Sequence, residues 1–344
     1  MKAMNIQKNV SLAGHSTMGL GGSAAYLAEV TNRAEVTEAL TWARQKQLPV
    51  VMIGEGSNII WSDEGYPGLV LIDKIRGYEV YDRGTGIYLT LGSGEPWDTV
   101  VERAVKAGLT GIEALSLVPG TTGATPVQNV GAYGQEIAQT LVTVEAFDTK
   151  TGGFVTLSGG DCGFGYRTSR FKTTDHGRFF ITSVTLRLTE GRPLPPFYGP
   201  VQTYFDEHDI SQPAPADLRQ AVIAIRTSKL PDPAAVHNTG SFFANPVVDE
   251  TKFKDLRTRH SMVPHWQTKD GRVKLSGAWL IEQAGFKDYH DAETGMATWP
   301  KQPLVLVNEH AKTTADLLAF KQKIVDAVQT KFGITLEQEP ESIS

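Results

Sequence analysis

The stretch that decides the fold is Pro119-Gly120-Thr121-Thr122-Gly123-Ala124-Thr125-Pro126-Val127-Gln128-Asn129-Val130-Gly131-Ala132-Tyr133-Gly134. It carries four glycines, three threonines and two amides but no charged side chain. A disordered linker would carry charge and lack apolar residues such as Val127, Val130 and Tyr133. An uncharged polar loop of this length inside a domain usually contacts a ligand. Its donors and acceptors suit a planar, hydrogen-bonding ring and a pyrophosphate, and a purely structural glycine-rich turn is the alternative.

A second glycine-rich loop, Gly54-Glu55-Gly56-Ser57-Asn58, directly follows the apolar segment 49–53, which is expected to be a strand. Successive N–H groups in such a loop can form an anion nest, and Ser57 and Asn58 add side-chain donors. The loop is not a Walker A motif, because no Gly-Lys-Ser/Thr follows, and it lacks the third glycine of the dinucleotide fingerprint. An ordinary turn at the end of a strand is an equally good interpretation.

Around these loops the predicted secondary structure is mixed. An apolar helical face over 32–47, followed by the apolar segments 49–53 and 69–72, predicts a small α+β unit. Hairpin patterns over 78–91 and 141–157 predict that the next unit is rich in strands. The proline-rich stretch 193–215 is expected to be irregular chain.

A third unit is expected from about residue 230. Thr313 and Asp316 can cap a long helix that Gly333 ends. Residues 334–337 are predicted to form a final strand.

Composition excludes several classes of protein. The chain has 344 residues and a net charge of −5, which predicts two or three domains and no non-specific nucleic-acid or polybasic membrane surface. The single cysteine, Cys162, excludes an intrachain disulfide framework, and the dispersed histidines give no reason to expect a metal site. No apolar run has the ~18 residues of a membrane span, and the first nine residues do not resemble a secretory signal. We therefore expect a cytoplasmic protein with no membrane or nucleic-acid partner.

Three further segments contain residue types that can carry out chemistry. Arg167 lies in Gly165-Tyr166-Arg167 and is either a surface residue with a stacked stem or a fixed cation beside a substrate carboxylate. Ser241 lies in an uncharged loop with aromatic anchors, but it is not in a G-x-S-x-G elbow, and a turn residue is the simpler interpretation. Carboxylates cluster at 337–341, where a solvated tail is the ordinary interpretation.

Taken in order, these segments resemble the UDP-N-acetylenolpyruvoylglucosamine reductase family, also called UDP-N-acetylmuramate dehydrogenases. The similarity runs from about Asn9 to Glu339. It rests on the two loops, on Gly165-Tyr166-Arg167, and on three more segments: Lys229-Leu230-Pro231, Gly240-Ser241-Phe242-Phe243-Ala244-Asn245-Pro246 and Leu336-Glu337-Gln338-Glu339. Each segment alone is weak, but six in order with plausible spacing are specific.

The resemblance implies an α+β FAD-binding fold of the vanillyl-alcohol-oxidase type. It divides the chain into a first FAD-binding subdomain (1–76), a second (77–228) and an α+β substrate-binding domain (229–332). The C-terminal strand, 333–344, is expected to return to the second subdomain. The expected oligomeric state is a monomer.

The resemblance also implies the reaction. NADPH reduces non-covalently bound FAD, and the enolpyruvyl group of UDP-N-acetylglucosamine enolpyruvate then accepts hydride, giving UDP-N-acetylmuramate for peptidoglycan, and hence for cell shape and division. Arg167 and Glu339 match the family's residues at the substrate carboxylate, and Ser241 matches the acid that protonates C2. Gln338 replaces a usual proline, so Glu337 is the alternative to Glu339.

The resemblance further implies two sets of binding residues. Those at the cofactor are Gly54, Gly56, Ser57, Asn58, Pro119, Gly120, Gly123, Gln128, Asn129, Gly131, Ala132 and Tyr133. Those at the nucleotide-sugar are Tyr198, Lys229, Asn245 and Gln302. Two other functions remain open: another FAD-dependent oxidoreductase of the same fold, and a catalytically inactive nucleotide-sugar binding protein.

Overall fold

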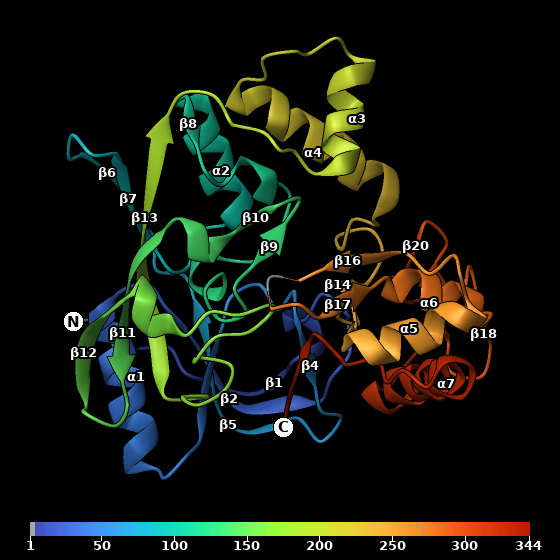
Figure 1. Cartoon of the computed structure of the whole chain (residues 1–344). Helices are drawn as coiled ribbons and strands as arrows, with labels where there is room; N and C mark the ends of the chain where they lie inside the picture. The colour runs from blue at the N-terminus through green and yellow to red at the C-terminus, as the bar shows by residue number, and fades with distance from the viewer. Residues whose placement is uncertain (1–3, 269) are drawn as a thin grey trace. The chain divides into compact units, whose positions relative to one another are not determined.

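The computed structural model describes residues 4–268 and 270–344, which form two compact units (Figure 1). Unit 1 comprises residues 1–10, 24–55 and 67–228, and unit 2 comprises residues 11–23, 56–66 and 229–344. The chain therefore crosses between the units five times.

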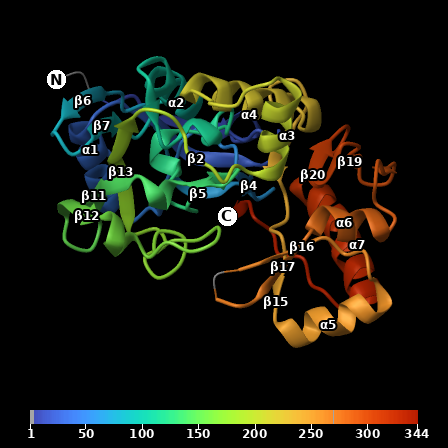
Figure 2. The ribbon, with the colours of Figure 1, turned by 45° about the horizontal axis from the view of Figure 1, so that its top comes forward.

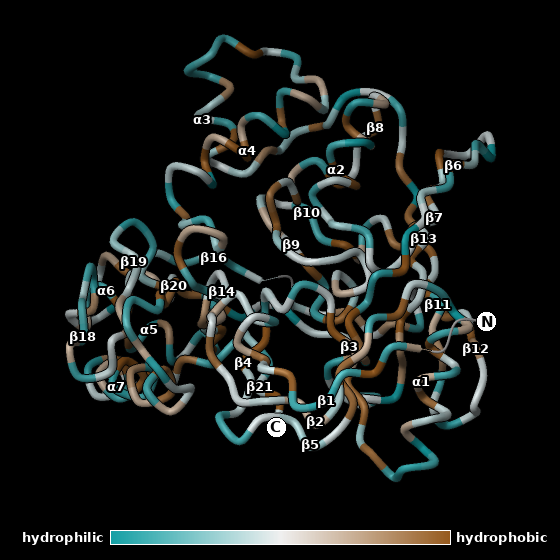
Figure 3. Tube along the Cα trace, turned by 180° about the vertical axis from the view of Figure 1, so that it is seen from behind, coloured by the Kyte–Doolittle hydropathy of each residue, from teal (hydrophilic) through white to brown (hydrophobic). Residues whose placement is uncertain are grey.

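The first sheet of unit 1 has the strand order β1-β2-β5-β3. Its strands are β1 (Gln7–Ser11), β2 (Ser23–Val30), β3 (Val50–Ile53) and β5 (Tyr66–Asp73), with β3 parallel to β5. Helix α1 (Arg33–Gln45) begins where the Asn32 side chain accepts from the N–H of Glu35, which confirms the predicted cap. The apolar face of α1 packs against the buried Leu69 and Leu71 of β5. In Figure 3 the trace is brown, the colour of hydrophobic residues, where β3 lies.

The second sheet of unit 1 is antiparallel, with the order β12-β11-β13-β7-β6. It contains β6 (Tyr78–Asp82), β7 (Ile87–Gly92), β11 (Leu141–Asp148), β12 (Gly153–Ser158) and β13 (Phe179–Glu190), and β8 (Leu109–Thr110) pairs with the end of β13. Both predicted hairpins are confirmed. Helix α2 (Trp97–Lys106) buries Trp97, Val100, Val101 and Ala104 in the core of this sheet.

Two helices of unit 1 come from the proline-rich stretch and the segment after it. Helix α3 (Gly199–Glu207) has Pro200 in its first turn, and α4 spans Pro215–Lys229. The expectation of irregular chain over 193–215 was wrong for α3, because a proline in the first turn removes no N–H that the helix needs. The two helices lie side by side in Figures 1 and 2, and we call residues 197–228 the helical insert.

Unit 2 contains a four-stranded sheet, β14-β20-β19-β18, and a three-stranded one, β15-β17-β16. Its strands are β14 (Asn238–Ser241), β15 (Val247–Val248), β16 (His265–Gln267), β17 (Val273–Leu275), β18 (His290–Asp291), β19 (Met296–Trp299) and β20 (Gln302–Asn308). Its helices are α5 (Glu250–Arg259), α6 (Gly277–Gln283) and α7 (Thr314–Phe332). Helix α7 has the predicted capping box of Thr313 and Asp316 and ends at Gly333 in a left-handed conformation, so its predicted bounds are confirmed.

The end of the chain differs from expectation in two ways. Residues 334–337 are not a strand; instead, Ile334 and Leu336 are buried in the apolar core of unit 2. The terminal strand is β21 (Glu341–Ile343), which pairs in parallel with β4 (Ile59–Trp61) in unit 2 rather than joining the second predicted subdomain. Backbone hydrogen bonds from Glu341 N to Asn58 O (3.0 Å) and from Ser62 N to Ile343 O (2.8 Å) fix this pairing.

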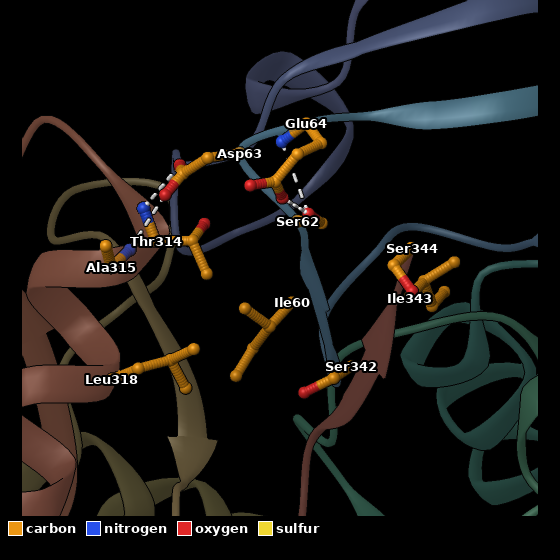
Figure 4. A pocket seen from close by; sticks show the side chains of 10 residues that line it. All are labelled: Ile60, Ser62, Asp63, Glu64, Thr314, Ala315, Leu318, Ser342, Ile343 and Ser344. Atoms are coloured by element: carbon orange, nitrogen blue, oxygen red, sulfur yellow. Dashed lines mark hydrogen bonds between the residues drawn. The ribbon is translucent and has the colours of Figure 1, made fainter.

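A pocket of about 220 Å³ lies beside β4, β21 and the start of α7 (Figure 4). The Asp63 carboxylate accepts hydrogen bonds there from the N–H groups of Thr314 (2.7 Å) and Ala315 (2.9 Å), and its negative charge suits the positive end of the α7 dipole. None of the residues predicted for the active site lines this pocket.

The division into domains at residues 76 and 228 stays a prediction. Unit 1 contains all of 77–228, and the boundary after residue 228 is also a boundary between the units. No helix in residues 4–268 and 270–344 is long and apolar enough to cross a bilayer.

The buried carboxyl of Asp73, at the end of β5, predicts a pH-dependent stability. Burial raises its pKa to about 6, and the side chain is 4% exposed. The folded state binds the proton of the Asp73 carboxyl more tightly than the unfolded chain does. The contribution of Asp73 to the free energy of unfolding therefore falls as pH rises from about 4 to 6. Asp73→Asn keeps an acceptor for the N–H of Ile75 and removes the penalty. We expect the variant to gain about 2–3 kcal/mol over the wild type between pH 4 and pH 7 in urea unfolding.

Asp82→Asn, at the exposed last residue of β6, is the control for the loss of one negative charge. A gain for Asp73→Asn that does not change with pH would contradict the prediction.

Candidate active site

The two glycine-rich loops contact each other within unit 1. The Glu55 carboxylate accepts a hydrogen bond from the N–H of Gly120 at 3.0 Å. A Cβ on Gly54 would lie 2.3 Å from the Thr121 hydroxyl, so only glycine permits this close approach. The loops predicted for one cofactor are therefore brought together over residues 54–55 and 120–121.

The remaining residues of the first loop, Gly56, Ser57 and Asn58, belong to unit 2. Gly56 has a φ of +69°, and its carbonyl accepts from the N–H of Thr17 at 3.1 Å. A Cβ there would lie 2.1 Å from the backbone oxygen of His15. This glycine is therefore required by the packing of unit 2, whatever its role toward a cofactor.

The second loop is fixed by the connection between β7 and α2. Gly123 N donates to Ser93 O (2.7 Å), Thr122 N to Glu95 O (2.9 Å) and Trp97 N to Gly120 O (2.9 Å). A short 3₁₀ helix, η3 (Thr122–Ala124), results. The loop is thus held by its backbone, and no charged side chain of its own is needed.

Asn129 joins the second loop to the turn that carries Arg167. Its side-chain amide donates to the carbonyl of Gly165 at 3.0 Å and to the Glu136 carboxylate at 3.1 Å, and its oxygen accepts from the N–H of Ala138 at 3.1 Å. The residue is buried and has a φ of +48°. The side chain is committed to protein contacts, so its predicted role at the cofactor stays a prediction, and its visible role is to position the turn.

Arg167 lies against this loop. It is half-buried with a φ of +54°, and its guanidinium lies 5.3 Å from the centre of the Tyr166 ring. A Cβ on Gly131, in β9 (Gly131–Ala132), would lie 3.2 Å from Arg167 Nη1. Strand β9 pairs with β10 (Gln135–Glu136), which carries Glu136. Unit 1 therefore presents a fixed arginine beside the predicted cofactor loop.

Within unit 2, the backbone that follows Ser241 pairs with the terminal segment that carries Glu337 and Glu339. Ser241 ends β14, and the next residue, Phe242, accepts a hydrogen bond at its carbonyl from the N–H of Glu339 at 2.9 Å. Ala244 N donates to Glu337 O at 3.0 Å, so the two segments run antiparallel. Glu339 is half-buried and Glu337 is exposed.

The residues predicted for the nucleotide-sugar differ in their surroundings. In unit 2, the buried Gln302 Oε1 has no hydrogen-bond partner, whereas Asn245 Oδ1 accepts from Gly277 N at 2.9 Å at the start of α6. Lys229 is the last residue of α4, and its carbonyl accepts from Trp299 Nε1 at 3.0 Å. In unit 1, the Tyr198 ring is 43% exposed and packs edge-on against Tyr133 at 5.6 Å.

Sequence reasoning missed Glu55 as the residue that joins the two loops. The available signal was a single charge in loops that are otherwise uncharged. The structure also shows that Asp98 accepts a hydrogen bond from the N–H of Leu117, just before the second loop, and that Arg226 contacts Tyr133 within it. No local motif marks either residue. No group of three or more His, Cys, Asp or Glu side chains that could hold a metal occurs in the described ranges.

The residues present fit FAD. The close approach of Gly54 to Thr121 and the backbone attachment of Gly120–Gly123 hold two polar, glycine-rich loops together as a cradle on an α+β scaffold. Polar, glycine-rich loops suit a pyrophosphate and the edge of a flavin ring. The Arg167 guanidinium lies next to the cradle, and a fixed guanidinium is a group that can pair with an anionic reactant. This α+β fold and this site define a flavin-dependent oxidoreductase.

Comparison with known proteins agrees with this class. Residues 24–158 match the family model described as FAD binding domain, and residues 232–343 match UDP-N-acetylenolpyruvoylglucosamine reductase, C-terminal domain. The UDP-N-acetylenolpyruvoylglucosamine reductase of Chromobacterium violaceum is 38% identical, with 98% of each chain covered, and that of Alcanivorax borkumensis is 40% identical, with 96% of this chain and 94% of the other covered. This chain therefore belongs to the UDP-N-acetylenolpyruvoylglucosamine reductase family.

A solved structure supports the fold. The crystal structure of UDP-N-acetylenolpyruvylglucosamine reductase from Thermus caldophilus matches 99% of this chain and 100% of its own, with a TM-score of 0.69 at 24% identity.

The role of Asn129 gives a prediction about stability. Asn129→Asp replaces the donating NH₂ by a carboxylate oxygen facing two acceptors, Glu136 and the carbonyl of Gly165. Because the buried charge is repelled, we expect a loss of about 3 kcal/mol in urea unfolding at pH 7. Asn32→Asp is the control, since aspartate and asparagine are equivalent helix N-caps. Equal losses in both variants would contradict the role of Asn129.

Proposed function

We propose that this protein reduces the enolpyruvyl group of UDP-N-acetylglucosamine enolpyruvate to UDP-N-acetylmuramate, with non-covalently bound FAD and with NADPH as the source of electrons. The single observation that carries the proposal is the hydrogen bond from Glu339 N to Phe242 O, which pairs the backbone of the terminal segment with the residue that follows Ser241. Family membership supports the substrate. The product serves peptidoglycan synthesis.

Bound FAD would supply a hydride to C3 of the enolpyruvyl double bond. The electron pair of that bond then moves toward C2 and the carboxylate, and a proton must reach C2 to complete the reduction. Ser241 is the proposed donor of that proton. A serine hydroxyl is a weak acid, so it acts only because it is held in place and because the carbanion is a much stronger base.

Arg167 and Glu339 are proposed to hold the substrate carboxylate. The guanidinium neutralises the negative charge that develops there. Glu339 can assist only in its protonated form, because an ionised carboxylate would repel the intermediate. The half-burial of Glu339, compared with the exposure of Glu337, supports this choice.

The remaining assignments are proposed on the same basis. The cradle residues Gly54–Asn58 and Pro119–Tyr133 would hold FAD within subdomains 1–76 and 77–228. Lys229, Gln302, Asn245 and Tyr198 would bind the nucleotide-sugar, mainly in the domain 229–332. The unpartnered oxygen of Gln302 supports its role, and the bond of Asn245 to α6 adds a structural one. We further propose that the protein acts as a monomer in the cytoplasm.

Ser241→Ala tests the proton donor. We expect reduction of the flavin by NADPH to stay nearly normal, while reoxidation by the enolpyruvyl substrate slows on the order of a hundredfold. Anaerobic stopped-flow absorbance of the flavin measures both half-reactions separately. Ser261→Ala, at an exposed loop position, is the matched control. Equal slowing of both half-reactions would indicate a structural defect and contradict the assignment.

Glu339→Gln and Glu337→Gln test the register of the terminal motif. The first should slow flavin reoxidation by the substrate on the order of a hundredfold and leave the flavin content unchanged, because glutamine cannot donate a proton. The second should behave like the wild type, since Glu337 is exposed. The opposite pattern would shift the assignment by two residues.

A further inference from the structure

The helical insert has an apolar core that includes residues of the cofactor region. Val201 and Phe205 of α3 pack with Leu218 and Val222 of α4, and the same cluster contains the buried Ala114 and the partly buried Tyr133. All of these residues lie in unit 1. The insert therefore rests on the second glycine-rich loop rather than standing apart from it.

Asp98 lies where the insert and the loop meet. Its carboxylate accepts two hydrogen bonds from the Arg219 guanidinium, Nη1 to Oδ1 at 2.6 Å and Nη2 to Oδ2 at 2.9 Å. The same Oδ1 accepts from the N–H of Leu117 at 2.6 Å. One carboxylate thus binds both helix α4 and the backbone of Leu117, two residues before the loop begins.

The surroundings make this contact stronger than an ordinary surface ion pair. The Arg219 side chain is 12% exposed, and the pairing is bidentate. Burial acts to raise the pKa of Asp98, but the bonds from Arg219 and Leu117 outweigh it, and the pKa lies below its usual value. Leu117 has a φ of +56°, a strained conformation that its bond to Asp98 helps to hold.

A second arginine of α4 reaches the same loop. Arg226 is seven residues after Arg219, about two turns further along the same face of the helix, and it donates a hydrogen bond to the Tyr133 hydroxyl. The Tyr133 ring in turn contacts the ring of Tyr198 at the start of α3. A continuous set of contacts therefore runs from Asp98 through α4 and the loop to Tyr198.

We propose that Asp98 is a positioning residue that fixes the helical insert on the cofactor loop through Arg219 and thereby holds Tyr198 in place for the nucleotide-sugar. This inference rests on the proposed function for the role of Tyr198. Asp98 touches neither substrate nor cofactor in this scheme. Its effect is on the affinity for the nucleotide-sugar rather than on the transfer of hydride.

Two variants remove the ion pair between Asp98 and Arg219, one by changing each partner. Asp98→Asn keeps an acceptor for Leu117 but loses the ion pair, and Arg219→Met keeps Asp98 bonded to Leu117. In both FAD-loaded variants we expect about a tenfold rise in KM for the enolpyruvyl substrate, with kcat, flavin content and flavin reduction by NADPH unchanged. Glu102→Gln, which breaks an exposed ion pair with Lys106 on the same helix, is the matched control.

Hydrogen exchange gives a readout that does not depend on activity. Amides of α3 and α4 should exchange faster in Asp98→Asn and Arg219→Met, while those of α7 should not change. Unchanged exchange and unchanged KM would overturn the proposal. Faster exchange with unchanged KM would overturn the link to Tyr198.

A double-mutant cycle tests whether Asp98 acts through Tyr198. If it does, Asp98→Asn in a Tyr198→Ala background should raise KM no further, whereas fully additive effects would overturn the proposal. A wild-type protein that fails to reduce the enolpyruvyl substrate would refute the proposed function. In that case the exchange experiment would still decide whether Asp98 fixes the insert.

Discussion

The hydrogen bond from Gly123 N to Ser93 O, with its neighbours at Thr122 and Trp97, is the constraint on which the site depends. Four glycines leave the loop with few large side chains to bury, so its backbone groups must be satisfied by a neighbouring element. The connection between β7 and α2 meets that need. Once the loop is fixed, Asn129 can position the Arg167 turn, Glu55 can join the first loop, and the insert can pack on Tyr133.

The parts of the fold that sequence predicted are those with local causes. The bounds of α7 follow from a capping box and a terminal glycine within one stretch of chain, and the hairpins follow from alternation around short turns. The prediction of a strand over 334–337 was wrong because alternation in so short a stretch also fits a segment that buries Ile334 and Leu336 in the core of unit 2 without joining a sheet. The α3 helix was missed because proline was weighed as a breaker rather than as a first-turn residue.

The residues of the site divide in the same way, into those that local patterns mark and those that depend on distant contacts. The glycine-rich loops and Arg167 were marked by composition and by family motifs. By contrast, the bond between Asp98 and Arg219 joins residues 121 positions apart, and the bond between Glu55 and Gly120 joins residues 65 apart. No rule of periodicity or spacing predicts a contact between residues so far apart in the sequence. Glu337 and Glu339 share one side of an ideal strand, so only the antiparallel contact with Phe242 and their unequal burial distinguish them.

The pairing of β4 with β21, together with the Asp63 cap on α7, has a consequence for biosynthesis. Residues 56–66 leave the ribosome long before residues 314–343, yet neither segment has its native partner until the other is present. Unit 2 is thus assembled from segments separated by some of the longest intervals in the chain, and such contacts slow folding. Residues 229–344 translated as a separate fragment would lack both the strand that pairs with β21 and the carboxylate that caps α7. Unit 2 consequently completes its folding only after β21 has been synthesised.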